Sequence, residues 1–175
     1  MDKTLIEIRR LESEENTDEL GGFLIQLAKY GEQPLKYENE FRKHFSSSDW
    51  YLCKAAVFCL LFALQIDKPE YRNKALEFVN DKAEDEEVRR WAAAGLAQTY
   101  RNTKDKELLE LFITLIENNE EDDFFKETLL SSALQIYGLL SRDQWSRNSS
   151  VSPNLDEMFQ TFDEEITSIR ALVKS

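Results

Sequence analysis

The sequence is poor in the residues on which most catalytic centres depend. Its 175 residues include one histidine, His44, two cysteines, five glycines and three prolines. We therefore expect neither a multi-histidine metal site nor a Ser-His-Asp triad, because His44 ends a charged helix and suits a helix-terminal charge. So few glycines and prolines also argue against the turn-rich pattern of an all-β sandwich. We predict a protein without enzymatic activity and without a cofactor.

Long apolar segments and a secretion signal are missing as well. The longest uncharged apolar stretch, residues 55–66, is shorter than the about 20 residues that a membrane span needs. The first residues show neither the apolar core nor the small-residue cleavage site of a signal peptide. From these features we expect a soluble cytoplasmic protein.

The two cysteines, Cys53 and Cys59, lie in that same apolar part of the chain. Their spacing on a helix corresponds to a rotation of about 240°, so the two sulfurs diverge and can neither form a disulfide nor share a metal. We expect both to be buried and to act as small apolar side chains.

Negative charge is the strongest compositional feature. Asp and Glu number 34 against 22 Lys and Arg, which gives a formal net charge of −12. Binding to a phosphate backbone or to an anionic membrane requires a surplus of basic residues, so we expect no nucleic-acid or membrane partner. An acidic surface favours a basic protein as the partner.

Apolar residues recur every three or four positions along nearly the whole chain, and no window alternates strictly, so the predicted fold class is all-α. Asn16 with Glu19, and Asn154 with Glu157, have the spacing of a helix capping box. Pro69 and Pro153 lie at or just before helix starts. The predicted helices cover residues 2–14, 17–30, 34–46, 49–66, 69–82, 86–101, 104–118, 122–140 and 155–173.

A repeat of about 36 residues organises the middle of the chain. The segment that starts at Asp49 recurs 36 residues later at Asp85 and a further 37 residues later at Asp122. Such a period is typical of stacked helix pairs, which bury a continuous core only together. We expect Asp85 to cap its helix and Arg89, one turn later, to pair with a neighbouring acid.

One face of the helix at 86–101, which also includes Thr99, is predicted to face the helix with which it is paired in its repeat. Val88, Ala92, Gly95 and Leu96 project within a narrow arc. The small residues at 92 and 95 allow two helix axes to approach closely.

The series Asp85-x-x-Val88-Arg89-x-x-Ala92-Ala93-x-Gly95-Leu96 resembles the second helix of a HEAT repeat, the armadillo-type helical solenoid. The family pattern has alanine at the position of Gly95. The copy at Asp49 has Cys53 in place of the arginine, and the copy at Asp122 has Lys126. The resemblance covers residues 34–140. It implies a solenoid that binds other macromolecules, usually along the concave face formed by the second helices.

Together these features predict one HEAT-like solenoid domain, residues 1–175, of three to four antiparallel helix pairs. It would consist of N-terminal capping helices in 1–33, repeats in 34–140, a loop in 141–154 and a C-terminal capping helix in 155–173.

Two surfaces are predicted for partner binding. Because a solenoid stacks equivalent turns on one edge, the acid-rich turns would form one acidic ridge. The second surface is an apolar stripe on the outer side of the second helices, where Phe58, Leu61 and Leu134 stand at positions expected to face solvent. The acidic ridge comprises Asp49, Glu84, Asp85, Glu86, Glu87, Glu120, Glu121, Asp122 and Asp123.

Each surface also has a purely structural interpretation. In this interpretation the acids serve only to stabilise helix N-termini. The apolar stripe is equally consistent with coverage by the N-terminal helices or by the C-terminal helix.

The expected function is that of a non-enzymatic protein-binding scaffold, an acidic immunity or antitoxin-type inhibitor that neutralises a basic, nuclease-like toxin. A general adaptor remains an alternative. The resemblance also leaves open an enzyme of the chromophore-lyase type, which attaches or removes bilins. HEAT-like proteins that excise damaged DNA bases need a basic channel, which a charge of −12 disfavours.

Overall fold

The computed structural model describes residues 2–118, 120–139 and 155–175, which form helices joined by short turns, and no strand occurs among them. The all-α prediction is therefore confirmed for this part of the chain. No helix in these ranges is long and apolar enough to cross a membrane. The chain divides into two compact units, Met1–Gly95 (unit 1) and Leu96–Ser175 (unit 2), which are described separately.

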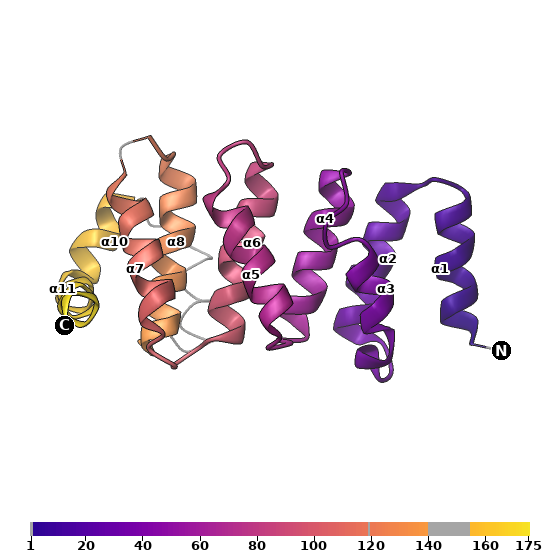
Figure 1. Ribbon diagram of the computed structural model, residues 1–175, viewed down its shortest axis with the longest axis horizontal. Coiled ribbons are helices and arrows are strands. Elements are labelled where there is room, and N and C mark those ends of the chain that lie inside the picture. Colours follow the sequence, from indigo (N-terminus) through magenta and orange to yellow (C-terminus); the bar gives the residue numbers. More distant parts are fainter. Residues whose placement is uncertain (1, 119, 140–154) are drawn as a thin grey trace. The chain divides into compact units, whose positions relative to one another are not determined.

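Unit 1 is built around α2, which packs against α1, η1, α4 and η2 (Figure 1). Its elements are α1 (Lys3–Ser13), α2 (Thr17–Tyr30), the 3-10 helix η1 (Pro34–Tyr37), α3 (Glu38–Lys43), α4 (Trp50–Val57), the π-helix η2 (Phe58–Ala63), α5 (Pro69–Asn80) and most of α6 (Glu86–Thr99).

Unit 2 is built on a helical hairpin in which α7 packs along α8, while α10 lies against α8 and α11 against α7 (Figure 1). In α10 and α11, Met158, Ile166 and Ile169 are buried, as the apolar pattern of 155–173 predicts. A hydrogen bond of 3.0 Å from Arg170 Nε to Glu117 Oε1 also joins α11 to α7. The helices of unit 2 are α7 (Lys106–Glu117), α8 (Asp123–Tyr137), α10 (Leu155–Thr161) and α11 (Asp163–Lys174).

Local signals at helix starts are confirmed where the structure describes them. The Glu19 N–H donates to Asn16 Oδ1 at 3.1 Å, and Asn16 Nδ2 donates to the Glu19 carboxylate at 3.0 Å. Pro69 occupies the first position of α5. The predicted signals at Pro153 and Asn154, and the predicted loop 141–154, lie outside the described residues.

Two predicted helices differ from the structure. Residues 49–66 form α4 followed by the π-helix η2, in which the Leu64 N–H donates to the Cys59 carbonyl at 3.0 Å. Nearly every position in this segment is apolar, so the hydrophobic pattern could not separate an α-turn from a wider one. Residues 155–173 form two helices that break at Phe162, whose φ of −114° and ψ of 25° are not helical.

The predicted close approach at α6 is present, but at Gly95 it is made to η2 and not to the paired helix α5. Val88, Ala92 and Leu96 are fully buried, and a Cβ added to Gly95 would lie 2.7 Å from Leu61 Cβ. That separation is too short for two carbon atoms that are not bonded to each other, so only glycine fits at position 95 without a shift of its neighbours. Gly22 in α2 is different, since a Cβ at this position would meet no atom within 4 Å.

The two glycines give a matched test of packing in unit 1. We expect Gly95→Ala to lower the free energy of unfolding by about 1–3 kcal/mol because of overpacking against Leu61. Gly22→Ala should raise it by about 0.4–1 kcal/mol by restricting the unfolded chain. Urea denaturation followed by circular dichroism measures both, and equal effects of the two changes would contradict the close approach.

Candidate functional site

Three acids of the predicted ridge cap helices. Asp49 Oδ1 accepts the Leu52 N–H at 3.0 Å, and Asp122 Oδ1 accepts the Phe125 N–H at 2.9 Å. At the start of α6, Asp85 Oδ1 accepts two backbone N–H groups, from Glu87 at 2.9 Å and Val88 at 3.4 Å. The repeated aspartate therefore accepts hydrogen bonds from free backbone amides at the start of α4, α6 and α8, as predicted for Asp85.

The other acids of unit 1 in this set are partly engaged. Glu87 Oε1 lies 2.6 Å from Arg90 Nη1, and its Oε2 lies 3.9 Å from Lys54 Nζ on α4. Glu84 Oε1 accepts the Asp85 N–H at 2.9 Å. Glu86 is exposed, and no ion pair joins it to another described residue.

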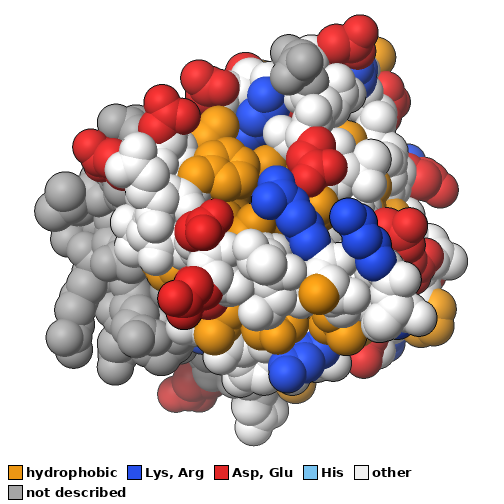
Figure 2. Space-filling model, turned by 90° about the vertical axis from the view of Figure 1, so that its left-hand side faces the viewer, with side chains coloured by type: hydrophobic (Ala, Val, Ile, Leu, Met, Phe, Trp, Pro, Cys, Tyr) orange, Lys and Arg blue, Asp and Glu red, His pale blue; other side chains and the backbone are white. Residues whose placement is uncertain are grey.

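In unit 2 the acids of the turn before α8 face different surroundings. Glu120 and Asp123 are exposed. Glu121 is only 6% exposed, so its predicted place on an acidic surface is wrong. On the face shown in Figure 2, carboxylates lie scattered over the surface with a few Lys and Arg side chains among them. Because the ridge would span both units, a single continuous ridge stays a prediction.

The apolar stripe is not at the surface. Phe58 is 5% exposed, Leu61 1% and Leu134 0%, so these side chains do not present a docking surface, and that prediction is wrong for the described structure. In unit 1 the Phe58 ring stacks on Phe62 at 5.3 Å and meets Trp91 edge-on at 5.1 Å.

Helix α2 explains the burial of Phe58, because its Lys29 places Nζ 5.0 Å from the ring centroid and α2 packs along α4 and η2. Coverage by an N-terminal helix, the structural alternative, therefore accounts for the apolar residues of α4 and η2.

Arg89 links two helices. It is buried, and its Nε and Nη2 donate to the Val79 carbonyl at 3.4 and 3.1 Å. This carbonyl lies in the last turn of α5, where helix carbonyls lack an intrahelical donor. Arg89 thus joins the end of α5 to the start of α6.

Both cysteines are buried as free thiols. Burial raises the pKa of Cys53 to about 12, and burial also raises the pKa of Cys59 far above its usual value. Neither thiol is a nucleophile at neutral pH, because the reactive species is the thiolate. The described residues contain no group of three or more His, Cys, Asp or Glu side chains placed to hold a metal ion.

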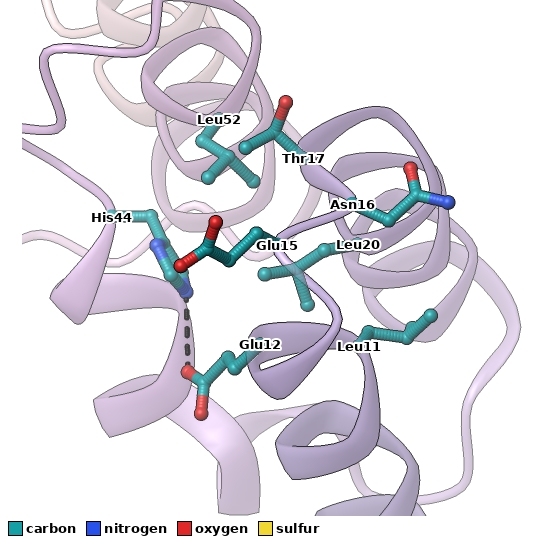
Figure 3. A pocket seen from close by; sticks show the side chains of 8 residues that line it. All are labelled: Leu11, Glu12, Glu15, Asn16, Thr17, Leu20, His44 and Leu52. Atoms are coloured by element: carbon teal, nitrogen blue, oxygen red, sulfur yellow. Dashed lines mark ion pairs between the residues drawn. The ribbon is translucent and has the colours of Figure 1, made fainter.

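A pocket in unit 1 was not predicted from the sequence. Its volume is about 390 Å³, at the small end of the range for ligand sites. It lies where α1 and α3 end and α2 and α4 begin (Figure 3). Its lining consists of Leu11, Glu12, Glu15, Asn16, Thr17, Leu20, His44 and Leu52.

His44 is the C-cap of α3, as its predicted position implies, but its side chain is 14% exposed and faces this pocket. Its Nε2 atom is buried, lies 3.5 Å from Glu12 Oε1, and has no hydrogen-bond partner among the described residues. Burial lowers the pKa of His44, although Glu12 opposes the shift, so the imidazole is neutral at pH 7.

No protein-family model, curated protein or solved structure matches this chain.

Removing one helix cap tests the role of the repeated aspartate. Asp85→Ala should lower the free energy of unfolding by about 1 kcal/mol, because two backbone amides lose their acceptor. Glu86→Ala, one residue later and exposed, should change it by less than about 0.5 kcal/mol. Urea denaturation measures the free energy of unfolding of both variants. Equal losses of stability would show that both acids act only through the electrostatics of the helix end and that Asp85 has no special role as a cap.

The pocket histidine makes a prediction about pH. Since burial lowers the pKa of His44 in the folded state, the unfolded chain takes up the proton first as pH falls. Wild-type stability should therefore decrease relative to His44→Gln as pH falls through and below about 6.5. Lys43, Glu12 and Glu40, which also act on this imidazole, are present in both proteins.

The measurement is direct, because the chain has one histidine and an untagged protein gives one Hε1 signal in a proton NMR titration. A midpoint above 6.5, or a relative gain of wild-type stability in acid, would contradict the assignment.

Proposed function

We propose that this protein is a non-enzymatic, acidic scaffold of the HEAT-like solenoid type that binds and neutralises a basic protein, in the manner of an immunity or antitoxin-type inhibitor. The observation that carries the proposal is the net charge of −12, much of it on exposed carboxylates at the turns between helices. Such a field speeds association with a cationic partner and disfavours anionic ones.

The turn between α1 and α2 adds to this charge. Glu12, Glu14, Glu15, Asp18 and Glu19 fall within a short stretch of chain. Arg10 lies 2.6 Å from Glu14 and 3.5 Å from Glu19. No ion pair joins Asp18 or Glu15 to another described residue, so negative charge is left for an external cation.

Helical hairpins with a shared device support the solenoid part of the proposal. In α3 to η2, α5 with α6, and α7 with α8, the second helix begins at a capping aspartate. The same position recurs at the same spacing in the sequence, which is typical of a repeat protein.

The proposal predicts salt-sensitive capture of one basic protein. Tagged protein purified from its native cells at low salt should retain a single stoichiometric basic protein that elutes as salt rises. The two purified proteins should then bind directly, and the association rate should fall as ionic strength increases.

A matched pair of variants locates the interaction. Glu86→Lys should weaken binding about three- to tenfold through slower association. Glu70→Lys is the control, because Glu70 is also an exposed first-turn acid but begins α5, at the opposite end of the hairpin from the start of α6. The two changes alter net charge and helix-end electrostatics equally.

Other outcomes would replace the proposal. Capture of several unrelated proteins without a salt dependence would favour a general adaptor. A coloured preparation that contains a bilin, or turnover of one, would favour a chromophore-lyase type of enzyme. Binding that is weakened equally by both variants would show that net charge alone attracts the partner.

A further inference from the structure

The pocket at the end of α1 combines an apolar floor with acidic walls. Leu11, Leu20 and Leu52 are buried and form the apolar part of its lining. Glu12 and Glu15 supply two carboxylates, and Figure 3 shows the Glu15 carboxylate turned toward the His44 side of the pocket. The Asn16 amide points away from it, toward its partner Glu19.

Of the basic residues nearest to the pocket, Lys43 contacts one carboxylate of the lining and Arg10 is engaged outside it. Lys43 Nζ lies 3.6 Å from Glu12, but its closest partner is the Glu40 carboxylate, whose hydrogen bond is the main reason why the pKa of Lys43 is raised. Arg10 is held by Glu7 at 2.7 Å and by Glu14 at 2.6 Å. The carboxylate of Glu15 has no cationic partner among the described residues.

Neither the histidine nor the helix ends supply positive charge. With its pKa lowered, His44 is neutral at pH 7 and can offer a ring nitrogen as an acceptor. Two helices end at the pocket and two begin beside it, so their dipoles largely cancel. The Glu15 carboxylate, which has no cationic partner among the described residues, therefore gives the pocket its preference for a cation, while Glu12 shares Lys43 with Glu40.

The backbone at Glu15 has a left-handed conformation. Glu15 has φ of 53° and directly follows the C-cap of α1, the position at which helices commonly end in this conformation. The end of α1 thus places this carboxylate at the pocket.

We propose that this pocket accepts an arginine side chain presented by the basic partner, which rests on the proposed function. The leucines would cover the methylene groups, and the carboxylates would accept hydrogen bonds from the guanidinium. Arginine fits better than lysine, because its planar group pairs with two acceptors at once and is less strongly hydrated in a partly apolar site.

The test uses the intact protein and a small probe, N-acetyl-L-arginine methylamide, with the citrulline analogue as its uncharged control. Proton NMR of His44 Hε1 reports binding next to the carboxylates. We expect a saturable shift with arginine, with a Kd on the order of 1–10 mM, and no such shift with citrulline. Equal shifts with the two probes, or none with either, would overturn the proposal.

Variants separate the pocket from the general acidity of the turn. Glu12→Gln and Glu15→Gln should each weaken arginine binding about five- to tenfold. Glu14→Gln is the matched control, since Glu14 belongs to the same turn but does not line the pocket. Equal weakening by all three variants would overturn the proposal.

A fourth variant distinguishes a role in binding from a role in folding. Glu15→Gly removes the carboxylate and relieves the left-handed backbone, so binding should be lost while the melting temperature stays the same or rises. If the melting temperature fell, Glu15 would be a structural residue and the proposal would fail. Arginine binding in the absence of salt-sensitive capture would instead count against the proposed function alone.

Discussion

The packing of unit 1 depends on one constraint: the helix formed by α4 and η2 is apolar on nearly every side and has to be covered on every side. Helix α2 covers one side, and Trp91 and Gly95 of α6 meet another. The Cys53 thiol donates a hydrogen bond to the Phe45 backbone carbonyl at 3.7 Å. Because Gly95 has no Cβ, α6 can approach Leu61 of η2 this closely. The N-terminal helix α2 is thus part of the core of unit 1.

This constraint shows what the sequence can and cannot predict. Capping is local, so the boundaries of α2 and the roles of Asp85 and Asn16 follow from a few neighbouring residues. The burial of Phe58 depends on α2, which lies outside the 36-residue repeat of the sequence, so the repeat does not predict it. Leu61 packs instead against Gly95 of α6. The sequence does not predict the helix break at Phe162, because no glycine or proline lies at this position.

The pocket was missed for a related reason. Its lining comes from the end of α1, the start of α2, the cap of α3 and the first turn of α4, and each polar residue there also has an ordinary explanation at a helix end. Only the density of acids in residues 12–19 was visible in advance. The burial of His44 beside Glu12 of α1 is a product of tertiary structure. Acids thus have at least two uses in this protein, as helix caps and as unpaired charge, and sequence alone does not separate them.

The two buried thiols have a consequence for how opening of this protein can be observed. Cys53 lies in α4 and Cys59 in η2, and both side chains are buried in the core of unit 1. An alkylating reagent cannot reach either sulfur while these helices stay packed, and the raised pKa of each thiol further suppresses attack. The rate at which the two thiols are alkylated therefore reports how often the core of unit 1 opens, and no label has to be added to the chain.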